Sequence, residues 1–449
     1  MNRQSRRYKQ LRIVTLAVAG ALLVWLVTTR TYVAYLADAA PESALGLRSS
    51  DPEALLTRAD GMLNPRPSES TEAGSAGTTG ADQASSNPAS PVQSLSIDAS
   101  KRDEIRKLAE TALANDPLNA KALRILGQLA IDTGDEARAY KLMHAAGQRS
   151  NRESMAIYWL MLKSHEGRDY AAAIYYADLL LRTRPDAIKL VMPTLARMAE
   201  SKEANSELKK LITGNPPWRT RFFDVLPTNV TDARTPLDLL LSIRDTPEPP
   251  TARDLRSYLN FLIGRKFSDL AFYTWLQFLP PAQLSRTGLL FNGSFEITLS
   301  GLPFDWVISA GAGASVNTVA HPDQDGQRAL HLQFDNGRVN FGGVKQMIVL
   351  APGTYRFEGK YKGKITGRRG LLWRVTCVGA RSKLIGESQM VLGVTRSWKE
   401  FDLAFTVPGT ECPAQQVRLL HDARSASEQL VTGSMWYDEL KISRIVQTP

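Results

Sequence analysis

The apolar residues of this chain follow three spacings, and each spacing predicts a different kind of structure. From residue 13 to residue 36 they are nearly continuous, as in a helix that spans a membrane. From residue 97 to residue 284 they recur every three or four positions, which predicts amphipathic helices. After Leu289 they alternate with polar residues, which predicts short strands. We therefore expect a multidomain α plus β protein with an N-terminal transmembrane helix, a helical region and a C-terminal antiparallel β-sandwich.

The helical region repeats its own pattern at an offset of 34 residues. Ala139 in the first copy corresponds to Ala173 in the second, and the turn Thr133-Gly134-Asp135 corresponds to Gly167-Arg168-Asp169, with Pro185 closing the second copy. This period and this turn resemble the tetratricopeptide repeat (TPR). The resemblance implies a TPR-like α-solenoid, in which antiparallel helix pairs stack on their neighbours and bind other chains. An ordinary helical bundle with accidental spacing is the alternative.

The expected solenoid is interrupted once. Residues 37–64 carry an apolar helical face and are interpreted as the first helical repeat element. In residues 65–96 Ser, Thr, Gly, Ala and Pro dominate, which predicts a disordered linker because too little apolar surface is present to offset the entropy of ordering. Residues 97–284 are the expected TPR-like helical repeat domain, and its concave face is the expected binding surface for other envelope proteins.

The N-terminus has the charge pattern of a signal anchor. Residues 1–12 contain five basic residues and no acid, so they are expected to be a basic cytoplasmic tail ahead of a transmembrane signal anchor at residues 13–36. The alternative is a cleaved signal peptide, because Ala37-Asp38-Ala39 fits a cleavage site. That site lies farther beyond Val27 than is usual, which favours the anchor. Both interpretations export the body, so we expect a single-pass protein of the bacterial inner membrane with its C-terminal bulk in the periplasm.

The C-terminal region, residues 289–449, carries a series of aromatic and turn motifs in a characteristic order. These are Asn292-Gly293-Ser294-Phe295-Glu296, Trp306, Pro352-Gly353-Thr354-Tyr355, Trp398 and Trp436-Tyr437-Asp438-Glu439-Leu440. Their order resembles the galactose-binding-like jelly roll of carbohydrate-binding modules. The resemblance implies a jelly-roll β-sandwich that binds glycan, although the same architecture also serves as a purely structural domain.

The resemblance also implies one structural calcium ion between the opening loop and the last strand. The matching positions are Glu296 and Asp438. Calcium prefers six to eight oxygen ligands, so backbone carbonyls would have to complete such a site. The alternative is that both residues are solvated acids at strand ends.

Four residues are the candidates for contact with glycan. Trp398 alternates with the apolar residues of its strand, so it is the first candidate for stacking on a sugar ring, and Trp306, in a loop-like context, is the second. A place in the core is the alternative for each. Lys360 and Lys362 point outward from one strand, in a basic stripe that predicts binding of an acidic polysaccharide. An edge strand that lysines protect against pairing is the alternative for the stripe.

Composition narrows the function further. The net charge of +10 is spread along the chain, which does not favour nucleic acid as a partner. The two cysteines, Cys377 and Cys412, are too few for a zinc module, and in an exported protein they predict a disulfide within the sandwich. The sequence contains no nucleophile elbow and no phosphate loop. We therefore expect a scaffold without enzymatic activity that belongs to an envelope or exopolysaccharide assembly system. A pure protein scaffold with a structural sandwich and a glycan-processing enzyme are the alternatives.

Overall fold

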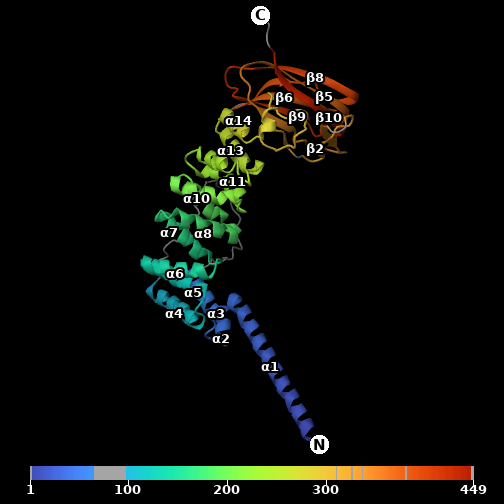
Figure 1. The fold of residues 1–449 in the computed structure, drawn as a ribbon. Helices are drawn as coiled ribbons and strands as arrows, with labels where there is room; N and C mark the ends of the chain where they lie inside the picture. The colour runs from blue at the N-terminus through green and yellow to red at the C-terminus, as the bar shows by residue number, and fades with distance from the viewer. Residues whose placement is uncertain are drawn as a thin grey trace, which may run out of the picture. The chain divides into compact units, whose positions relative to one another are not determined.

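The computed structural model of the protein describes residues 3–64, 98–309, 311–324, 327–335, 337–379 and 382–445. The predicted linker at residues 65–96 lies outside these ranges. The chain divides into two compact units, Met1–Glu207 and Leu208–Pro449. Figure 1 shows the helices from α1 to α14 in the N-terminal part of the chain and the strands in the C-terminal part.

The first unit is helical. Its elements are α1 (Arg3–Ala39), α2 (Pro41–Leu47), α3 (Pro52–Leu63), α4 (Ala99–Asn115), α5 (Ala120–Asp132), α6 (Glu136–Arg149), α7 (Ser154–Glu166), α8 (Tyr170–Thr183), a short 3-10 helix (Pro185–Ala187), α9 (Ile188–Met198) and the start of α10 (Lys202–Thr213). Helices α3 and α4, α5 and α6, and α7 and α8 pack as neighbours in contact. This arrangement is compatible with a helical repeat domain.

One type of turn joins the two helices within each of the copies that the 34-residue offset relates. The second residue after the first helix of each pair adopts the left-handed backbone conformation, with φ of 75° at Gly134 and 59° at Arg168. The next residue is an aspartate whose side chain accepts a hydrogen bond from the first turn of the following helix, at 3.0 Å for Asp135 and 3.1 Å for Asp169. Each pair of helices is therefore joined by a helix stop followed directly by a helix cap.

The helices on the two sides of the predicted linker belong to one core. Leu56 and Ala59 of α3 and Ile105 and Ala109 of α4 are all fully buried in the same apolar cluster. Because α3 and α4 pack against each other, residues 64–98 join the two helices of a single pair. The segment up to residue 64 thus shares its core with the repeat helices that follow.

The small residues of the repeat lie where helices touch. Ala139 and Ala173 are both completely buried. Replacing Ala173 with leucine is therefore expected to overpack this contact and to lower the free energy of unfolding by about 1 to 3 kcal/mol. Ala171→Leu, at an exposed position of the same helix, is the control and should change stability by less than about 0.5 kcal/mol. Equal thermal unfolding curves for the two variants would contradict this assignment.

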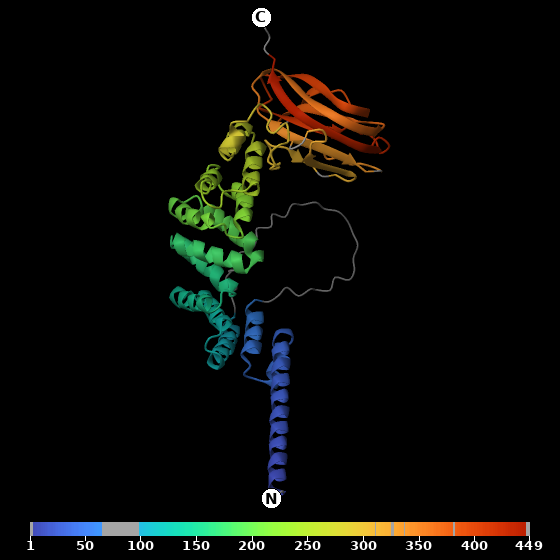
Figure 2. The same cartoon turned by 45° about the vertical axis from the view of Figure 1, so that its right-hand side comes forward.

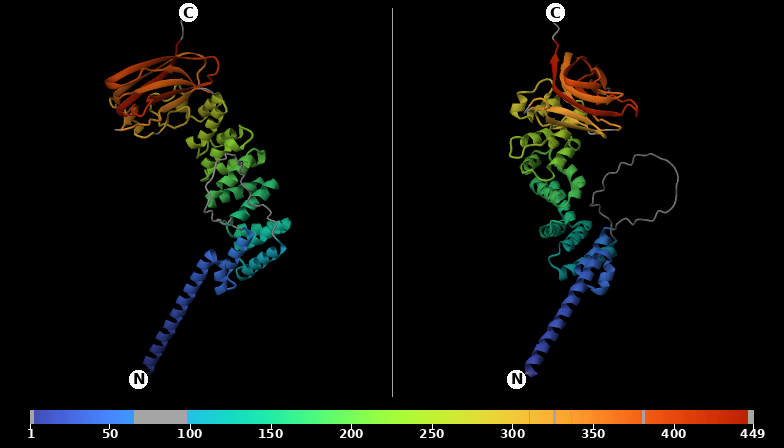
Figure 3. Two further views of the ribbon diagram at one scale, coloured as in Figure 1. Left: turned by 180° about the vertical axis from the view of Figure 1, so that it is seen from behind. Right: turned by 90° about the vertical axis from the view of Figure 1, so that its right-hand side faces the viewer.

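Among the residues that the structure describes, one helical segment is long and apolar enough to cross a membrane, Val18–Ala39. It belongs to α1, which continues without a break from residue 3 to residue 39 (Figure 3). This helix is compatible with a single-pass anchor and with a signal sequence. Its last turns contact α2 and α3, where Val33 and Ala37 are buried against Ala44 and Ala54.

The second unit begins with helices and ends with the sandwich. Its helices are α11 (Arg219–Asn229), α12 (Thr235–Ser242), α13 (Ala252–Gly264), α14 (Ser268–Gln277) and α15 (Pro281–Leu284). Lys266, between α13 and α14, has a φ of 69°, so the left-handed helix stop of the first unit recurs here, whereas Phe267 replaces the capping aspartate. The helices end against the first loop of the sandwich, where Trp275 of α14 contacts Phe291 with ring centroids 5.0 Å apart.

The strands form two five-stranded sheets that pack face to face (Figure 2). They are β1 (Val307–Ile308), β2 (Ala314–Ala320), β3 (Arg328–Phe334), β4 (Val344–Ile348), β5 (Gly353–Gly367), β6 (Leu371–Val378), β7 (Lys383–Glu387), β8 (Gly393–Val407), β9 (Ala414–His421) and β10 (Val431–Arg444). The strand orders are β1-β4-β9-β6-β7 and β2-β3-β10-β5-β8, and all the described pairs are antiparallel. The expected antiparallel sandwich is confirmed.

The core of the sandwich consists of the residues that alternate inward. On β3 these are Leu330, Leu332 and Phe334, and on β5 they include Tyr355 and Phe357, all less than 4% exposed. The residues between them point away from the core because successive side chains of a strand lie on opposite faces. The outward residues of the second sheet, β2-β3-β10-β5-β8, form the candidate site.

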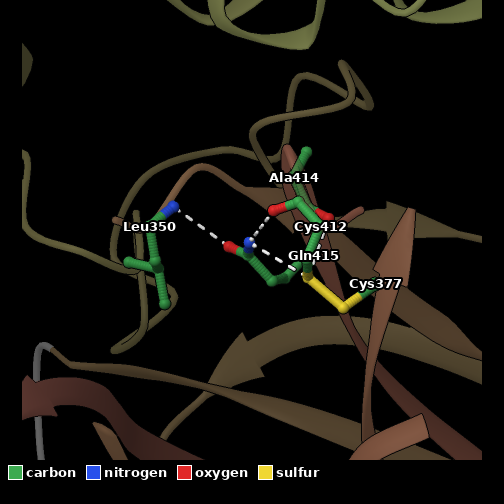
Figure 4. The surroundings of a disulfide bond; sticks show 5 residues. All are labelled: Leu350, Cys377, Cys412, Ala414 and Gln415. Atoms are coloured by element: carbon green, nitrogen blue, oxygen red, sulfur yellow. Dashed lines mark hydrogen bonds between the residues drawn. A yellow bond between two sulfur atoms is a disulfide. The ribbon is translucent and has the colours of Figure 1, made fainter. Parts of the chain in front are cut away.

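A disulfide joins Cys377 of β6 to Cys412 just before β9, with their Cα atoms 5.0 Å apart (Figure 4). Beside it lies the buried amide of Gln415. Its oxygen accepts a hydrogen bond from the Leu350 N–H at 3.0 Å, and its nitrogen donates to the Cys412 carbonyl at 3.0 Å. The bridge and this amide together hold the start of β9 against β6 and against the chain that follows β4.

Candidate functional site

The second sheet carries a continuous row of side chains on its outward side, which we call the outer face. Cross-strand pairing places Asn317 of β2 opposite His331 of β3, His331 opposite Trp436 of β10, and Trp436 opposite Lys362 of β5. Directly paired residues point to the same side of a sheet. Because Leu330 and Leu332 point into the core, His331 and the residues paired with it point outward.

Two rings lie in contact at the centre of this row. The ring centroids of His331 and Trp436 are 4.2 Å apart and the rings are tilted by 35°. Partial burial lowers the pKa of His331, so the imidazole is neutral at neutral pH. Both side chains remain partly exposed. The pair therefore offers an uncharged aromatic surface that can stack on a flat, weakly polar ring.

A second row of the outer face is polar. Ser315, Gln333, Ser434 and Lys364 are paired in that order across β2, β3, β10 and β5. Their hydroxyl, amide and ammonium groups supply donors and acceptors next to the aromatic pair. Such a combination can bind a molecule that has one apolar face and a rim of hydroxyl groups.

The loop between β2 and β3 folds onto the outer face through Trp398 of β8. The indole of Trp398 stacks on His321, with ring centroids 4.9 Å apart and the planes 19° from parallel. Its Nε1–H donates to the Asp323 carboxylate at 2.7 Å, and the Lys362 ammonium forms an ion pair with the same carboxylate at 2.8 Å. One ring face of Trp398 is thus covered by protein. Trp398 therefore anchors a loop beside the row, and its role as a stacking platform for sugar stays a prediction.

Asp438 lies beneath this loop and connects it to the last strand. Its carboxylate is buried, 3.5 Å from Nε2 of His321, and accepts a hydrogen bond from the Glu439 N–H at 2.6 Å. Burial raises the pKa of Asp438 to about 6, and the charge of the nearby Glu296 adds to that rise. The two acids of the expected calcium site are therefore neighbours.

Their surroundings do not fit calcium. One oxygen of Glu296 accepts a hydrogen bond from the Arg328 N–H at 3.0 Å, and both oxygens of Asp438 face nitrogen groups. Among the described residues no three acidic, histidine or cysteine side chains gather as a metal-binding group. A calcium ion needs six to eight oxygen ligands, and these two side chains leave few free. We therefore assign no metal to Glu296 and Asp438.

The raised pKa of Asp438 gives a testable pH dependence. A carboxyl group whose pKa is higher in the folded than in the unfolded protein stabilises the fold fully below about pH 4, and this stabilisation is lost as the pH rises through about 6. Asp438→Asn cannot ionise, so its melting temperature relative to the unmodified protein should rise between pH 4 and pH 7.

The exposed Asp402→Asn on the same face is the control for this pH series. The difference between the melting temperatures of Asp438→Asn and the unmodified protein should rise with pH, whereas Asp402→Asn should show no such rise. Added calcium should leave all three melting temperatures unchanged. A calcium-dependent rise that Asp438→Asn abolishes would show that the ion binds here after all.

A groove of about 780 Å³ continues the outer face toward the other end of the sheet. Its lining residues are Gly293, Ser294, Arg356, Glu358, Gly359, Lys360, Glu400, Phe401, Asp402, Glu439, Leu440 and Lys441. Three of them are basic and four are acidic. Lys360 forms an ion pair with Glu439 at 2.8 Å, which is also the main cause of its raised pKa.

These contacts correct the expected basic stripe. The lysines predicted to form it, Lys360 and Lys362, each lie against an acid, and β8 places Glu400 directly opposite Lys360. The acids come from β8, β10 and the β2–β3 loop, which alternation along β5 alone does not reveal. The groove is thus of mixed charge, and the attraction for an acidic polymer that the stripe predicted is not supported.

The prediction for Trp306 was wrong. Its side chain is completely buried and its Nε1–H donates to the Asn292 carbonyl at 2.9 Å. The ring packs against Phe295 and Trp373 in the core of the sandwich. Trp306 therefore fixes the opening loop and has no free face for a ligand.

Comparison with known proteins gave structural likenesses to the C-terminal region. No protein-family model matches the sequence, and no curated protein is similar to it. The region is similar to a CBM4 carbohydrate-binding module, with 16% identity and a TM-score of 0.26 over 35% of this chain and 99% of that one. It is also similar to the CBM22-1 xylan-binding domain from Paenibacillus barcinonensis, with 15% identity and a TM-score of 0.24 over 35% of this chain and 94% of that one.

A third similar structure is TmCBM61 in complex with β-1,4-galactotriose, with 17% identity and a TM-score of 0.25 over 35% of this chain and 99% of that one. The C-terminal region thus resembles the β-sandwiches of carbohydrate-binding modules. What the outer face binds has to follow from its own residues.

Proposed function

We propose that this protein is a membrane-anchored glycan-binding scaffold whose sandwich binds polysaccharide on the outer face. The observation that carries the proposal is the pair of His331 and Trp436 between Asn317 and Lys362, next to a row of hydroxyl, amide and ammonium groups. A pyranose ring has an apolar face for the rings and a hydroxyl rim for the polar row. The groove lies farther along the same sheet, beyond the loop of His321 and Asp323, and could hold further sugar units of a long polymer.

The ligand we propose is a neutral or weakly charged polysaccharide. The basic side chains of the groove are balanced by acids, so long-range attraction of a polyanion contributes little. Binding should therefore change little between low and physiological salt, because screening acts mainly on exposed charges.

The helical repeats are proposed to hold other envelope proteins, and α1 to hold the chain in the inner membrane with its body in the periplasm. Charge around the apolar segment supports this orientation, since five basic residues and no acid lie in the twelve residues before it. A reporter fused after Pro449 should be active only outside the cytoplasm. Activity of that fusion inside the cytoplasm would contradict the orientation.

The glycan proposal is tested by screening the full-length chain in detergent against immobilised neutral β-linked and uronic-acid polysaccharides. We expect retention on at least one neutral polymer at low and at physiological salt. Retention only on the uronic-acid polymers, lost with salt, would support the original basic stripe. No retention on any polymer would favour a pure protein scaffold, and release of reducing sugar during the screen would favour an enzyme.

A further inference from the structure

The C-terminal end of α1 packs against other helices of the protein. Val33 and Ala37 of α1 are buried against Ala44 and Ala54. Helices α2 and α3 carry charged residues such as Glu42, which hydrocarbon would exclude. The hydrocarbon therefore has to end before Val33, several residues earlier than the apolar pattern alone suggests.

The remaining apolar segment still spans a bilayer. Residues 13–29 form a helix about 26 Å long, close to the thickness of the hydrocarbon. This places Arg30 at the level of the lipid phosphates. Trp25 and Tyr32, 64% and 58% exposed, lie on the two sides of this level, as aromatic residues do at membrane surfaces.

A cavity of about 420 Å³ opens at the same level, between the end of α1 and the end of α2. Its lining residues are Trp25, Leu26, Thr29, Arg30, Tyr32, Val33, Leu47 and Arg48. Leu47 at the end of α2 is 62% exposed, and the two arginines are also exposed to solvent. Among the residues that the structure describes, the acidic partner of Arg48 is Asp51, at the long distance of 4.0 Å.

This cavity has one basic wall and one apolar wall. Arg30 and Arg48 bring two positive charges to one wall, and guanidinium groups bind phosphate with two parallel hydrogen bonds. Leu26 and Leu47 make another wall apolar. A phospholipid has both features, a phosphodiester and the beginning of an acyl chain, at this depth of the membrane.

We propose that Arg30 and Arg48, with Leu47, bind the phosphate-bearing headgroup of a phospholipid and so seat the body on the bilayer. This proposal depends on the membrane anchoring proposed above and is independent of glycan binding. The bound lipid fixes α2, and with it the first helix pair, at a set height above the membrane.

The test uses the full-length chain, extracted from nanodiscs that contain phosphatidylglycerol and phosphatidylcholine, with lipid retention measured by native mass spectrometry. Single Arg30→Gln and Arg48→Gln variants should weaken phosphatidylglycerol retention about fivefold each, and the double variant about thirtyfold. Arg106→Gln, at a helix far from the cavity in sequence, is the matched control and should retain lipid like the unmodified chain.

Two outcomes would overturn the lipid site. One is equal retention in the double variant and in the control. The other is displacement of the lipid by inorganic phosphate, which would make this a site for free phosphate. Resistance of the double variant to alkaline extraction from membranes reports on the anchor alone, so loss of the anchor and loss of the lipid site are distinguishable.

Discussion

Replacing Cys377 and Cys412 together by alanine is expected to lower the free energy of unfolding by about 4 kcal/mol. The bridge closes a loop of 35 residues, and most of its effect comes from restricting the unfolded chain. Both cysteines are nearly fully buried, so the alanines also lose a small amount of packing. Chemical unfolding of the full-length protein in detergent, followed by tryptophan fluorescence, measures the loss.

The reduced protein provides the control for this experiment. Treatment with a thiol reductant under unfolding conditions should bring the unmodified protein to the stability of the double variant, and it should leave the double variant unchanged. If two free thiols are found in full-length protein purified without reductant, the bridge does not form in the cell. Equal stability of the oxidised protein and the double variant would contradict the entropic argument.

Gly293→Ala is expected to destabilise the sandwich by about 3 kcal/mol, at the upper end of overpacking effects. A Cβ atom at this position would lie 1.8 Å from the carbonyl oxygen of Leu440, which belongs to the backbone of β10 and cannot rotate away. The Gly293 carbonyl also accepts a hydrogen bond from the Leu440 N–H at 3.0 Å. The substitution therefore separates the opening loop from the last strand at the rim of the groove.

Gly409→Ala is the matched control, because a Cβ atom there would meet nothing within 4 Å. Thermal unfolding of the two variants should differ clearly, with the control close to the unmodified protein. Similar melting temperatures for both variants would mean that the opening loop is not packed on β10 as described.

Local rules account for much of the fold. The stop and cap around Gly134 recur at the related turn around Arg168 because each turn is specified by neighbouring residues. Alternation along β3 and β5 likewise placed Leu332 and Phe357 in the core, because burial of one face is a property of the strand itself. The sequence pattern was therefore sufficient to predict an apolar N-terminal helix, a helical region and an antiparallel sandwich.

The site depends on pairing between strands, which the sequence pattern does not contain. Trp436 was not predicted as a site residue, and its pairing with His331 and Lys362 shows that it points outward while Tyr437 beside it points inward. Alternation with the buried Met435 and Tyr437 was the available signal. Trp306 was predicted to be free for a ligand because it lies in a loop. A loop can also place its side chain in the core, as it does here.

The charge of the outer face also depends on strand pairing, which the sequence pattern does not contain. Lysines at alternate positions of β5 are visible in the sequence, whereas their partners come from segments far away along the chain. Asp323 is 39 residues from Lys362, and Glu439 lies on another strand than Lys360. The register of the sheet shows that acids lie beside these lysines, so the surface is of mixed charge and not a basic stripe.

The central claim is that the outer face binds polysaccharide through Trp436, and equilibrium titration of the full-length protein with a polymer retained in the screen tests it most directly. Trp436→Ala should weaken binding about thirtyfold or more, as expected for a tryptophan at the centre of an interface. Leu384→Ala, which removes an exposed apolar side chain from the other sheet, should bind like the unmodified protein. Unchanged affinity of a folded Trp436→Ala variant would contradict the account.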